Sequence, residues 1–418
     1  MNRLGNRTHT MIITLIIALV ALATTGCSQD HDLQSYEWQE ASWETTLQAA
    51  KGSTVNIHMW GGSDQVNQYM DQYVATQVLT RYQVKLNRVP ITDARDLVNK
   101  LRTEKDLEKE DGSVDIFWLN GENFAIAKNE GLLLGNFVDK LPNYNALIDK
   151  TADDLRYDFG TPTEGLEAPW GRSQFVLIYD ETTTPQPPKT FEDLLTYAKK
   201  NPGMVTYPAP PDFTGSAFVR QVIMAHTADP IALLTIQDTT SIEQLSMGGL
   251  DYLEDLKPYL WRQGTTYPES SGKLDTMFGA GEVHFSMSYN PVHASNMITS
   301  GNFPETTRSF ILDSGSLTNT HYLTIPFNAA NPPGAQVVID FLLSEDAQIE
   351  KYKPSVWGDG FVIDTSLMSP EGAEAIGQMD RGIATLPADQ LEENKIPEMP
   401  GANVELLEDM WYERIAVQ

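Results

Sequence analysis

The chain has 418 residues, of which 41% are hydrophobic and 21% charged, so it can bury more than one core, and its length favours two lobes or domains. Lysine and arginine number 29 against 57 acidic residues, which gives a net charge of -28 at pH 7. A chain this acidic argues against binding nucleic acid or an anionic membrane surface by electrostatics.

The N-terminus reads as an export signal, residues 1–26. Two arginines precede an apolar run from Met11 to Ala23, and small residues then lead to Cys27. The apolar run is too short to remain in a bilayer as a spanning helix. The mature chain is therefore expected outside the cytoplasm, in the periplasm or cell envelope.

Cys27 is the only cysteine, so the chain has no internal disulfide. Its position directly after Thr-Thr-Gly resembles the lipobox of bacterial lipoproteins, in which the new N-terminal cysteine receives lipid. Thr24 departs from the usual leucine, which leaves open cleavage after Ala23 and a soluble secreted product. Residues 27–50 then form a tether and N-terminal segment.

Short runs of apolar and β-branched residues predict strands at 55–59, 84–89, 114–119, 175–179, 204–207, 283–289 and 322–327. Helical patterns lie between them. Thr190 with Asp193 forms a capping-box pattern, and Pro333 begins a run with helical spacing. This alternation predicts an α/β fold with mostly parallel sheets flanked by helices, which bind ligands beyond the carboxyl ends of their strands.

The familiar catalytic and cofactor motifs are absent from the sequence. It has no Gly-x-Ser-x-Gly, no His-Glu-x-x-His, no phosphate loop and no EF-hand spacing. The histidines have no partners at metal-ligand spacing. We therefore predict no catalytic residue, metal site or cofactor, and keep as the alternative an exported hydrolase that uses Glu122 and Asp212 as paired carboxylates.

Four loops combine an aromatic side chain with hydrogen-bonding groups, three of them directly after predicted strands. They supply the candidate ligand-binding residues Trp60, Gly61, Gly62, Ser63, Asn120, Glu122, Asn123, Asp212, Phe213, Thr214, Gly215, Ser216, Tyr289 and Asn290, to which Trp357 is added from SVWGDG. Glycines let a ligand approach backbone N–H groups, and helix starts aim those groups outward. We predict that the loops line one cleft; the alternatives are packing of Trp60 at a lobe edge and helix capping by the Asn120–Asn123 loop.

Several phrases within residues 52–365 resemble the extracellular solute-binding proteins of ABC transporters, the group that includes maltose, polyamine, thiamine and iron binders. The phrases are HMWGG, VDIFWLNGENF, EAPWGRSQFVLIYD, MFGAGEVHFSMSYNP and THYLTIPFNAANPPGAQVVIDFLLSEDAQ. The resemblance is closest to an uncharacterised enterobacterial-type branch. It implies a monomer with the two-lobe, type II periplasmic-binding-protein fold, which closes on a solute at a hinge and delivers it to a membrane permease.

The same resemblance implies where the chain crosses between the lobes. Crossings near 169–170, 289 and 325–326 would give lobe one residues 51–170 and 290–325, and lobe two residues 171–289 and 326–418. A sensor that docks on a signalling receptor instead of a permease is a further alternative.

The candidate residues favour one class of solute. Aromatic faces beside Glu122 and Asp212 suit an organic cation such as thiamine or a polyamine, with a sugar next because the same faces stack on sugars. Arg172 leaves two readings open. Its guanidinium could bind a carboxylate or phosphate, or it could pair with a neighbouring acid at the hinge.

Overall fold

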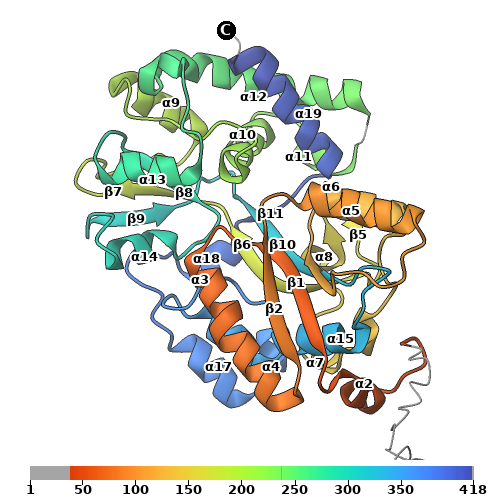
Figure 1. The fold of residues 1–418 in the computed structure, drawn as a ribbon. Helices are drawn as coiled ribbons and strands as arrows, with labels where there is room; N and C mark the ends of the chain where they lie inside the picture. Colours follow the sequence, from red (N-terminus) through yellow and green to blue (C-terminus); the bar gives the residue numbers. More distant parts are fainter. Residues whose placement is uncertain (1–37, 237, 417–418) are drawn as a thin grey trace, which may run out of the picture. The chain divides into compact units, whose positions relative to one another are not determined.

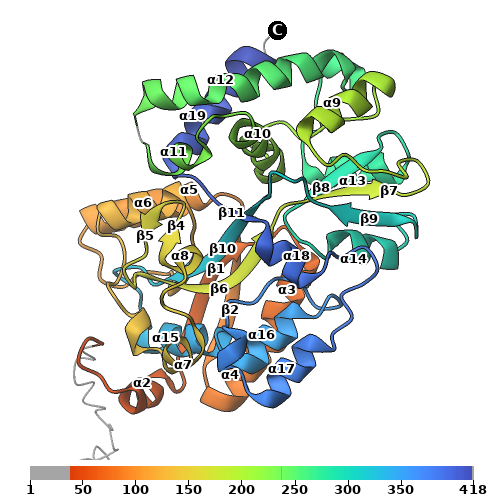
Figure 2. The same ribbon diagram turned by 180° about the vertical axis from the view of Figure 1, so that it is seen from behind.

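The computed structural model describes residues 38–236 and 238–416. The chain divides into two compact units, Met1–Glu40 and Ala41–Gln418. Of the first unit only residues 38–40 are described, and they form a turn. The expected leader and Cys27 lie outside the described residues. The second unit, drawn in Figure 1 and from behind in Figure 2, carries the architecture that follows.

A six-stranded mixed sheet, the first sheet, has the order β11-β10-β3-β1-β2, with β6 paired to β10. Its strands are β1 (Thr54–Trp60), β2 (Lys85–Ile91), β3 (Ile116–Trp118), β6 (Glu167–Gln174), β10 (Ser316–Thr324) and β11 (Lys395–Pro397). β1 is parallel to β2 and β3, and β10 is parallel to β11 but antiparallel to β3 and β6. In β1, Val55, Ile57 and Met59 are fully buried, as the alternation of a strand requires.

Helices cover both faces of the first sheet. Those before β6 are α2 (Trp43–Ala50), α3 (Asp64–Gln68), η1 (Tyr69–Val74), α4 (Ala75–Tyr82), α5 (Ala94–Asp106), α6 (Glu122–Asn129), η2 (Val138–Lys140), α7 (Pro142–Leu147) and α8 (Asp153–Arg156), with the hairpin β4 (Tyr157–Asp158) and β5 (Thr161–Pro162). After β10 come α15 (Pro332–Leu342), α16 (Glu345–Tyr352), η5 (Thr365–Leu367), α17 (Pro370–Gly377) and α18 (Ala388–Glu393). α15 packs on β1 and α2, and α4 packs on β2, beside which it lies in Figure 1.

A three-stranded sheet, the second sheet, has the order β8-β7-β9 and is antiparallel throughout. Its strands are β7 (Val176–Asp180), β8 (Phe285–Ser288) and β9 (Thr307–Phe310). The surrounding helices are α9 (Phe191–Lys200), α10 (Phe213–Ala225), α11 (Pro230–Thr235), α12 (Thr239–Leu256), η3 (Lys257–Tyr259), η4 (Trp261–Gly264), α13 (Ser271–Gly279), α14 (His293–Thr299), α19 (Gly401–Trp411) and η6 (Tyr412–Ala416).

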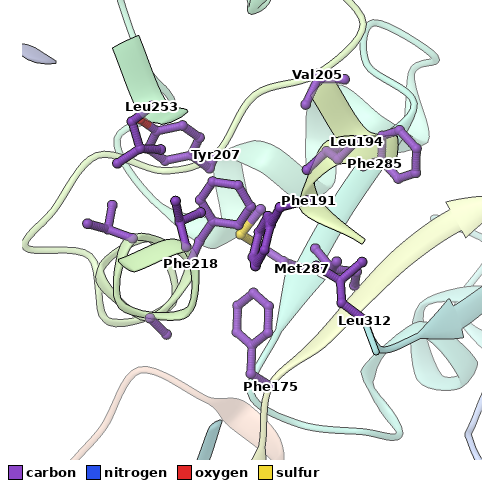
Figure 3. Packing of buried hydrophobic residues seen from close by; sticks show 14 of the residues in the cluster. Phe175, Phe191, Leu194, Val205, Tyr207, Phe218, Leu253, Phe285, Met287 and Leu312 are labelled. Carbon is purple, nitrogen blue, oxygen red and sulfur yellow. The ribbon is translucent and has the colours of Figure 1, made fainter. Parts of the chain in front are cut away.

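The core of this second part is rich in aromatic residues. Figure 3 shows Phe175, Phe191 and Phe218 gathered with Met287 between the second sheet and α10. The rings of Phe191 and Phe218 lie 6.0 Å apart in an edge-to-face arrangement, which favours their interaction beyond simple burial. The C-terminal helix α19 contributes Trp411 to the same core.

Most of the expected elements occur where the sequence predicts them. Strands β1, β2, β3, β7 and β8 overlap the predicted runs, and α9 begins with the predicted capping box at Thr190 and Asp193. The strand predicted at 204–207 is wrong. Met204 and Val205 accept only isolated hydrogen bonds, from the backbone N–H groups of His284 and Trp261, and no ladder forms.

Residues 307–310 and 332–342 each pack with a different sheet from the one that the expected lobe boundaries gave them. Residues 307–310 form β9, which pairs with β7, so the chain returns to the first sheet only at β10 and not near residue 289. Residues 332–342 form α15, whose Gly334 packs against Val55 of β1, so this helix stays with the first sheet. β6 remains paired with β10 through Gln174 and continues into β7 of the second sheet after the single residue Phe175.

No helix among the described residues has the length and apolar character needed to cross a membrane.

We expect Phe218→Ala to lower the free energy of unfolding by about 3–5 kcal/mol, because Phe218 is only 2% exposed and its truncation leaves a cavity in the core. Urea denaturation followed by circular dichroism measures the change. Leu107→Ala is the control, since Leu107 is 73% exposed. Equal midpoints for the two variants would contradict the assigned core.

Candidate functional site

In the loop after β1, the half-exposed ring of Trp60 lies next to Gly62. β1 ends at Trp60, which is 50% exposed, and a Cβ added to Gly62 would lie 2.4 Å from the Trp60 ring, so a side chain at this position would displace the ring. Asn67 donates a hydrogen bond to the carbonyl of Gly61 (2.9 Å), and Ser63 caps α3. The loop thus holds an aromatic face toward solvent beside a helix N-terminus.

Asn120, in the loop after β3, forms hydrogen bonds to β3 and to β10, a strand that connects the two sheets. Its Oδ1 accepts a hydrogen bond from Nε1 of Trp118 (2.9 Å), and its Nδ2 donates to the carbonyl of Thr320 on β10 (2.6 Å). The N–H of Gly121, at φ 64°, donates to the carboxyl of Asp158 (2.5 Å). Burial raises the pKa of Asp158 to about 8, although the hydrogen bonds from Gly121 and Asn120 oppose the shift.

Four aromatic side chains gather beside Asn120 and form the aromatic cluster, Trp118, Trp170, His321 and Trp357. The ring of Trp118 lies 5.2 Å from that of Trp170, 5.1 Å from His321 and 6.1 Å from Trp357. The buried Lys351 ammonium lies 5.4 Å from the Trp357 ring. Trp357, a predicted site residue, is only 6% exposed and presents little surface to a solute.

Lys351 pairs with Asp359 (2.7 Å), which His321 also contacts (3.1 Å). Burial lowers the pKa of Lys351, against the charge of Asp359. Nε1 of Trp170 is buried without a protein partner, so the aromatic cluster contains one free hydrogen-bond donor.

The predicted ligand residue Asp212 serves instead as a helix cap. One carboxylate oxygen accepts from the backbone N–H groups of Thr214 and Gly215 at the start of α10, and the other from Ser271 at the start of α13. A Cβ on Gly215 would lie 2.0 Å from the carbonyl oxygen of Pro208, so this glycine is required for packing. Thr214 is buried as well.

Beyond that cap, α10 carries a buried charge cluster, the Arg220 cluster, which consists of Ser216, Arg220, Tyr289, Glu398 and Glu408. The Arg220 guanidinium binds both carboxylate oxygens of Glu398 (2.9 and 3.2 Å), and Tyr289 donates to one of them (2.5 Å). Ser216 accepts from Arg220 (2.6 Å) and donates to Glu408. Burial raises the pKa of Glu408, although Ser216 and Arg220 oppose the shift.

Phe213 covers this cluster from the solvent side. It is 48% exposed, and its ring lies 4.7 Å from that of Tyr289. The Arg220 guanidinium carbon is 6.0 Å from the same ring. An exposed aromatic face therefore stands directly beside buried acids and one cation.

Asn290 joins the two clusters. It follows Tyr289 in the chain, and its Nδ2 donates to the carbonyl of Trp357 (3.2 Å). The structure therefore brings together six predicted residues, Asn120, Phe213, Ser216, Tyr289, Asn290 and Trp357. No other ring stacks on Trp60 in the described part of the chain, and its ring is half exposed.

Glu122, the first residue of α6, faces α19. Arg95 lies between it and Glu405 of α19, at 3.5 and 2.8 Å. A Cβ on Gly401 would lie 2.8 Å from the backbone nitrogen of Glu122, which shows how closely α6 and α19 meet. Partial burial and the neighbouring Glu405 raise the pKa of Glu122 to about 7. Oδ1 of Asn123 is buried with no protein partner.

Sequence reasoning missed Arg220, Glu398 and Trp118. An arginine inside the apolar run SAFVRQVIM was a usable signal, because a charge in a buried helix needs a partner. Glu398 gave no such signal in its proline-rich segment. Arg172 pairs with Asp154 (2.9 Å), which agrees with the hinge reading.

Metal binding finds no support here: within residues 38–236 and 238–416, no group of three or more His, Cys, Asp or Glu residues could hold an ion.

The raised carboxyl pKa values imply a stability that depends on pH. Glu122 and Asp158 have ordinary values of 4.5 and 3.8 but folded values of about 7 and about 8. Because the folded protein keeps these protons longer than the unfolded chain, their stabilisation is complete below the ordinary values and is lost as the pH rises through 7 and 8.

We therefore expect the urea midpoint of unfolding to fall between about pH 5.5 and about pH 8.5. Asp158→Asn removes the titrating proton but keeps an acceptor for Gly121, so it should flatten this fall. Asp106→Asn, at an exposed position, is the control. An unchanged slope in Asp158→Asn would show that Asp158 titrates normally.

Comparisons with known proteins agree with this architecture. The family model described as bacterial extracellular solute-binding protein matches residues 68–376. Protein YnjB of Escherichia coli is 42% identical over 333 residues, which cover 79% of this chain and 85% of that protein.

Two solved structures show the fold. The periplasmic binding protein AfuA of Actinobacillus pleuropneumoniae, with exogenous fructose-6-phosphate bound, covers 88% of this chain and 99% of its own at 14% identity and a TM-score of 0.59. The spermidine/putrescine ABC transporter substrate-binding protein PotD of Streptococcus pneumoniae covers 86% and 99% at 15% identity and a TM-score of 0.58. The expected type II periplasmic-binding-protein fold is thereby confirmed.

Proposed function

Because the chain belongs to the family of bacterial extracellular solute-binding proteins, as its motifs predicted, we propose that it captures an organic cation and delivers it to the permease of an ABC importer. The solute lies between the two parts of the molecule, against Phe213 and the Arg220 cluster on one side and Asn120 on the other. A solute of the thiamine or polyamine type fits this arrangement.

The observation that carries the proposal is the charge around Phe213. Arg220 is already bound by Glu398, Ser216 and Tyr289, so few of its donors remain for an anionic solute. Two carboxyl groups face this single guanidinium, because Glu408 joins Glu398 in the cluster. An exposed aromatic face beside surplus negative charge favours a cation through cation–π and charge-assisted contacts.

A sugar is the second candidate solute. Trp60 and Phe213 are both about half exposed, and such faces stack on a sugar ring as readily as they hold a cation. The two classes differ in their dependence on Glu408, whose charge matters only for the cation.

We propose binding without catalysis. The alternative hydrolase needs Glu122 and Asp212 to act as a pair, but both Asp212 oxygens accept hydrogen bonds from backbone N–H groups. Glu122 in turn faces Glu405 and Arg95. These contacts support a purely binding role.

We expect Phe213→Ala to weaken solute binding by about 1–3 kcal/mol, the usual range for an aromatic anchor, while the protein stays folded. Trp60→Ala should fall in the same range if its loop closes onto the solute. Isothermal titration calorimetry with spermidine, thiamine and maltose measures both effects. Ile231→Ala, 69% exposed and outside both clusters, is the control.

Glu408→Gln separates the solute classes, because it removes one charge and keeps the hydrogen-bonding shape. A cation should bind at least several-fold more weakly, whereas a sugar should be unaffected. Binding of maltose alone, or cation affinity that survives both Phe213→Ala and Glu408→Gln, would contradict the proposed solute and site.

We also propose that Cys27 anchors the exported chain through lipid, since it follows a small-residue segment and is the only cysteine. Cys27→Ser should abolish incorporation of radiolabelled palmitate and move the protein from the membrane to the soluble fraction. Unchanged fractionation and no labelling of the wild type would instead favour cleavage after Ala23.

A further inference from the structure

A polar pocket lies along β6 and β10, and none of the Arg220 cluster residues line it. Arg172 of β6 sits opposite Thr320 of β10, and both line this pocket. The next residue on β10, His321, contributes to the aromatic cluster. Because successive side chains of a strand point to opposite faces, the pocket and the aromatic cluster occupy opposite faces of the hinge.

Three cationic side chains line the pocket, Arg172, Arg381 and Lys395, against two acids, Asp154 and Glu392. Asp154 binds Arg172 (2.9 Å) and lies 3.5 Å from Lys395, which also binds Glu392 (2.5 Å). The two positive charges of Arg172 and Lys395 are therefore matched by the two negative charges of Asp154 and Glu392. Arg381 remains as one positive charge in excess.

Arg381 is held without an acidic partner. Its Nη2 donates to the carbonyl of Gly358 (2.6 Å), and its guanidinium carbon lies 3.8 Å from the centre of the Tyr352 ring. No carboxylate lies within ion-pair distance of it in the part of the chain that the structure describes. Burial lowers the pKa of Arg381, so the surroundings disfavour this unpaired charge.

The two guanidinium groups are also short of acceptors. Nε of Arg172 and Nε of Arg381 are both buried without a protein hydrogen-bond partner. Thr318, Thr320 and Gln174 lie along the same wall, but their side chains already donate to backbone carbonyls. A small ligand rich in acceptor oxygens would satisfy the two guanidinium groups and neutralise the excess charge.

We propose that this hinge pocket binds a small oxyanion of the phosphate or sulfate class, separately from the solute. The pocket has a volume of about 140 Å³, which suits a few heavy atoms and excludes a large solute. Planar guanidinium forks match the oxygens of such an anion better than a point charge does. This site is distinct from the proposed cation cleft and does not depend on it.

The walls of the pocket give the anion a route to the hinge. They come from β6, β10 and β11, from Pro291 after β8, and from the Arg381 segment. β6 and β10 connect the two sheets, and Pro291 lies between β8 and β9 of the second sheet, so an anion that requires one spacing between these walls favours one hinge angle over others. The anion thereby shifts the affinity for the solute.

The test is calorimetric titration of the full chain with inorganic phosphate and with sulfate, at constant ionic strength maintained with chloride. We expect saturable binding of at least one of the two, and a loss of at least tenfold in affinity in Arg381→Gln. Lys395→Gln, at a more exposed position, should weaken binding as well and guards against misfolding of the first variant. Arg262→Gln is the matched control and should bind like the wild type, because Arg262 is exposed and its guanidinium stacks on the partly buried Trp261.

Two results would overturn the proposal. One is the absence of saturable heat with either anion beyond the chloride background. The other is anion binding that keeps its full affinity in both Arg381→Gln and Lys395→Gln, which would place the anion elsewhere on the protein.

Discussion

The pairing of β10 with β6 holds the two parts of this molecule together. β10 follows β9 of the second sheet, and β6 leads into β7, so both strands are crossings. They pair with each other from Thr318 opposite Gln174 to Thr324 opposite Glu167, and β10 also pairs with β3 and β11. A change of hinge angle must therefore be absorbed at the ends of this ladder, near Phe175 and residues 311–315.

Two buried ion pairs fix the segments that return to this hinge. Lys351 with Asp359 holds the chain after α16 against β6, and Arg220 with Glu398 holds the segment before α19 against α10. Burying a charge is costly, and removing one partner of such a pair typically costs about 3–5 kcal/mol. Each pair therefore favours the observed position of its segment, because a displaced segment would leave a buried charge unpaired.

The sequence predicted what depends on near neighbours. Alternation located β1, the Thr190–Asp193 spacing located the start of α9, and the motif phrases identified the family and its fold. Sequence patterns failed to predict the structure where contacts between distant residues decide whether a segment forms a strand. The 204–207 run has the residues of a strand, but no strand lies beside it to complete a ladder.

The candidate site shows the same division. Phe213, in a loop, and Tyr289, at the end of a predicted strand, were recognisable as candidate aromatics, and the structure places their rings in contact. Asp212 looked like a free carboxylate because its second partner, Ser271, lies 59 residues away. Glu398 and Arg220 are 178 residues apart, so their pairing could not be foreseen from spacing.

The position and charge of the solute are tested most directly by a crystal structure of the exported protein with the solute that co-purifies with it or that binds in titration. We expect a positively charged molecule between Asn120 and the Phe213 ring, beside Glu408. A solute that lies away from both Phe213 and Asn120, or an anionic solute held there by Arg220, would contradict this expectation.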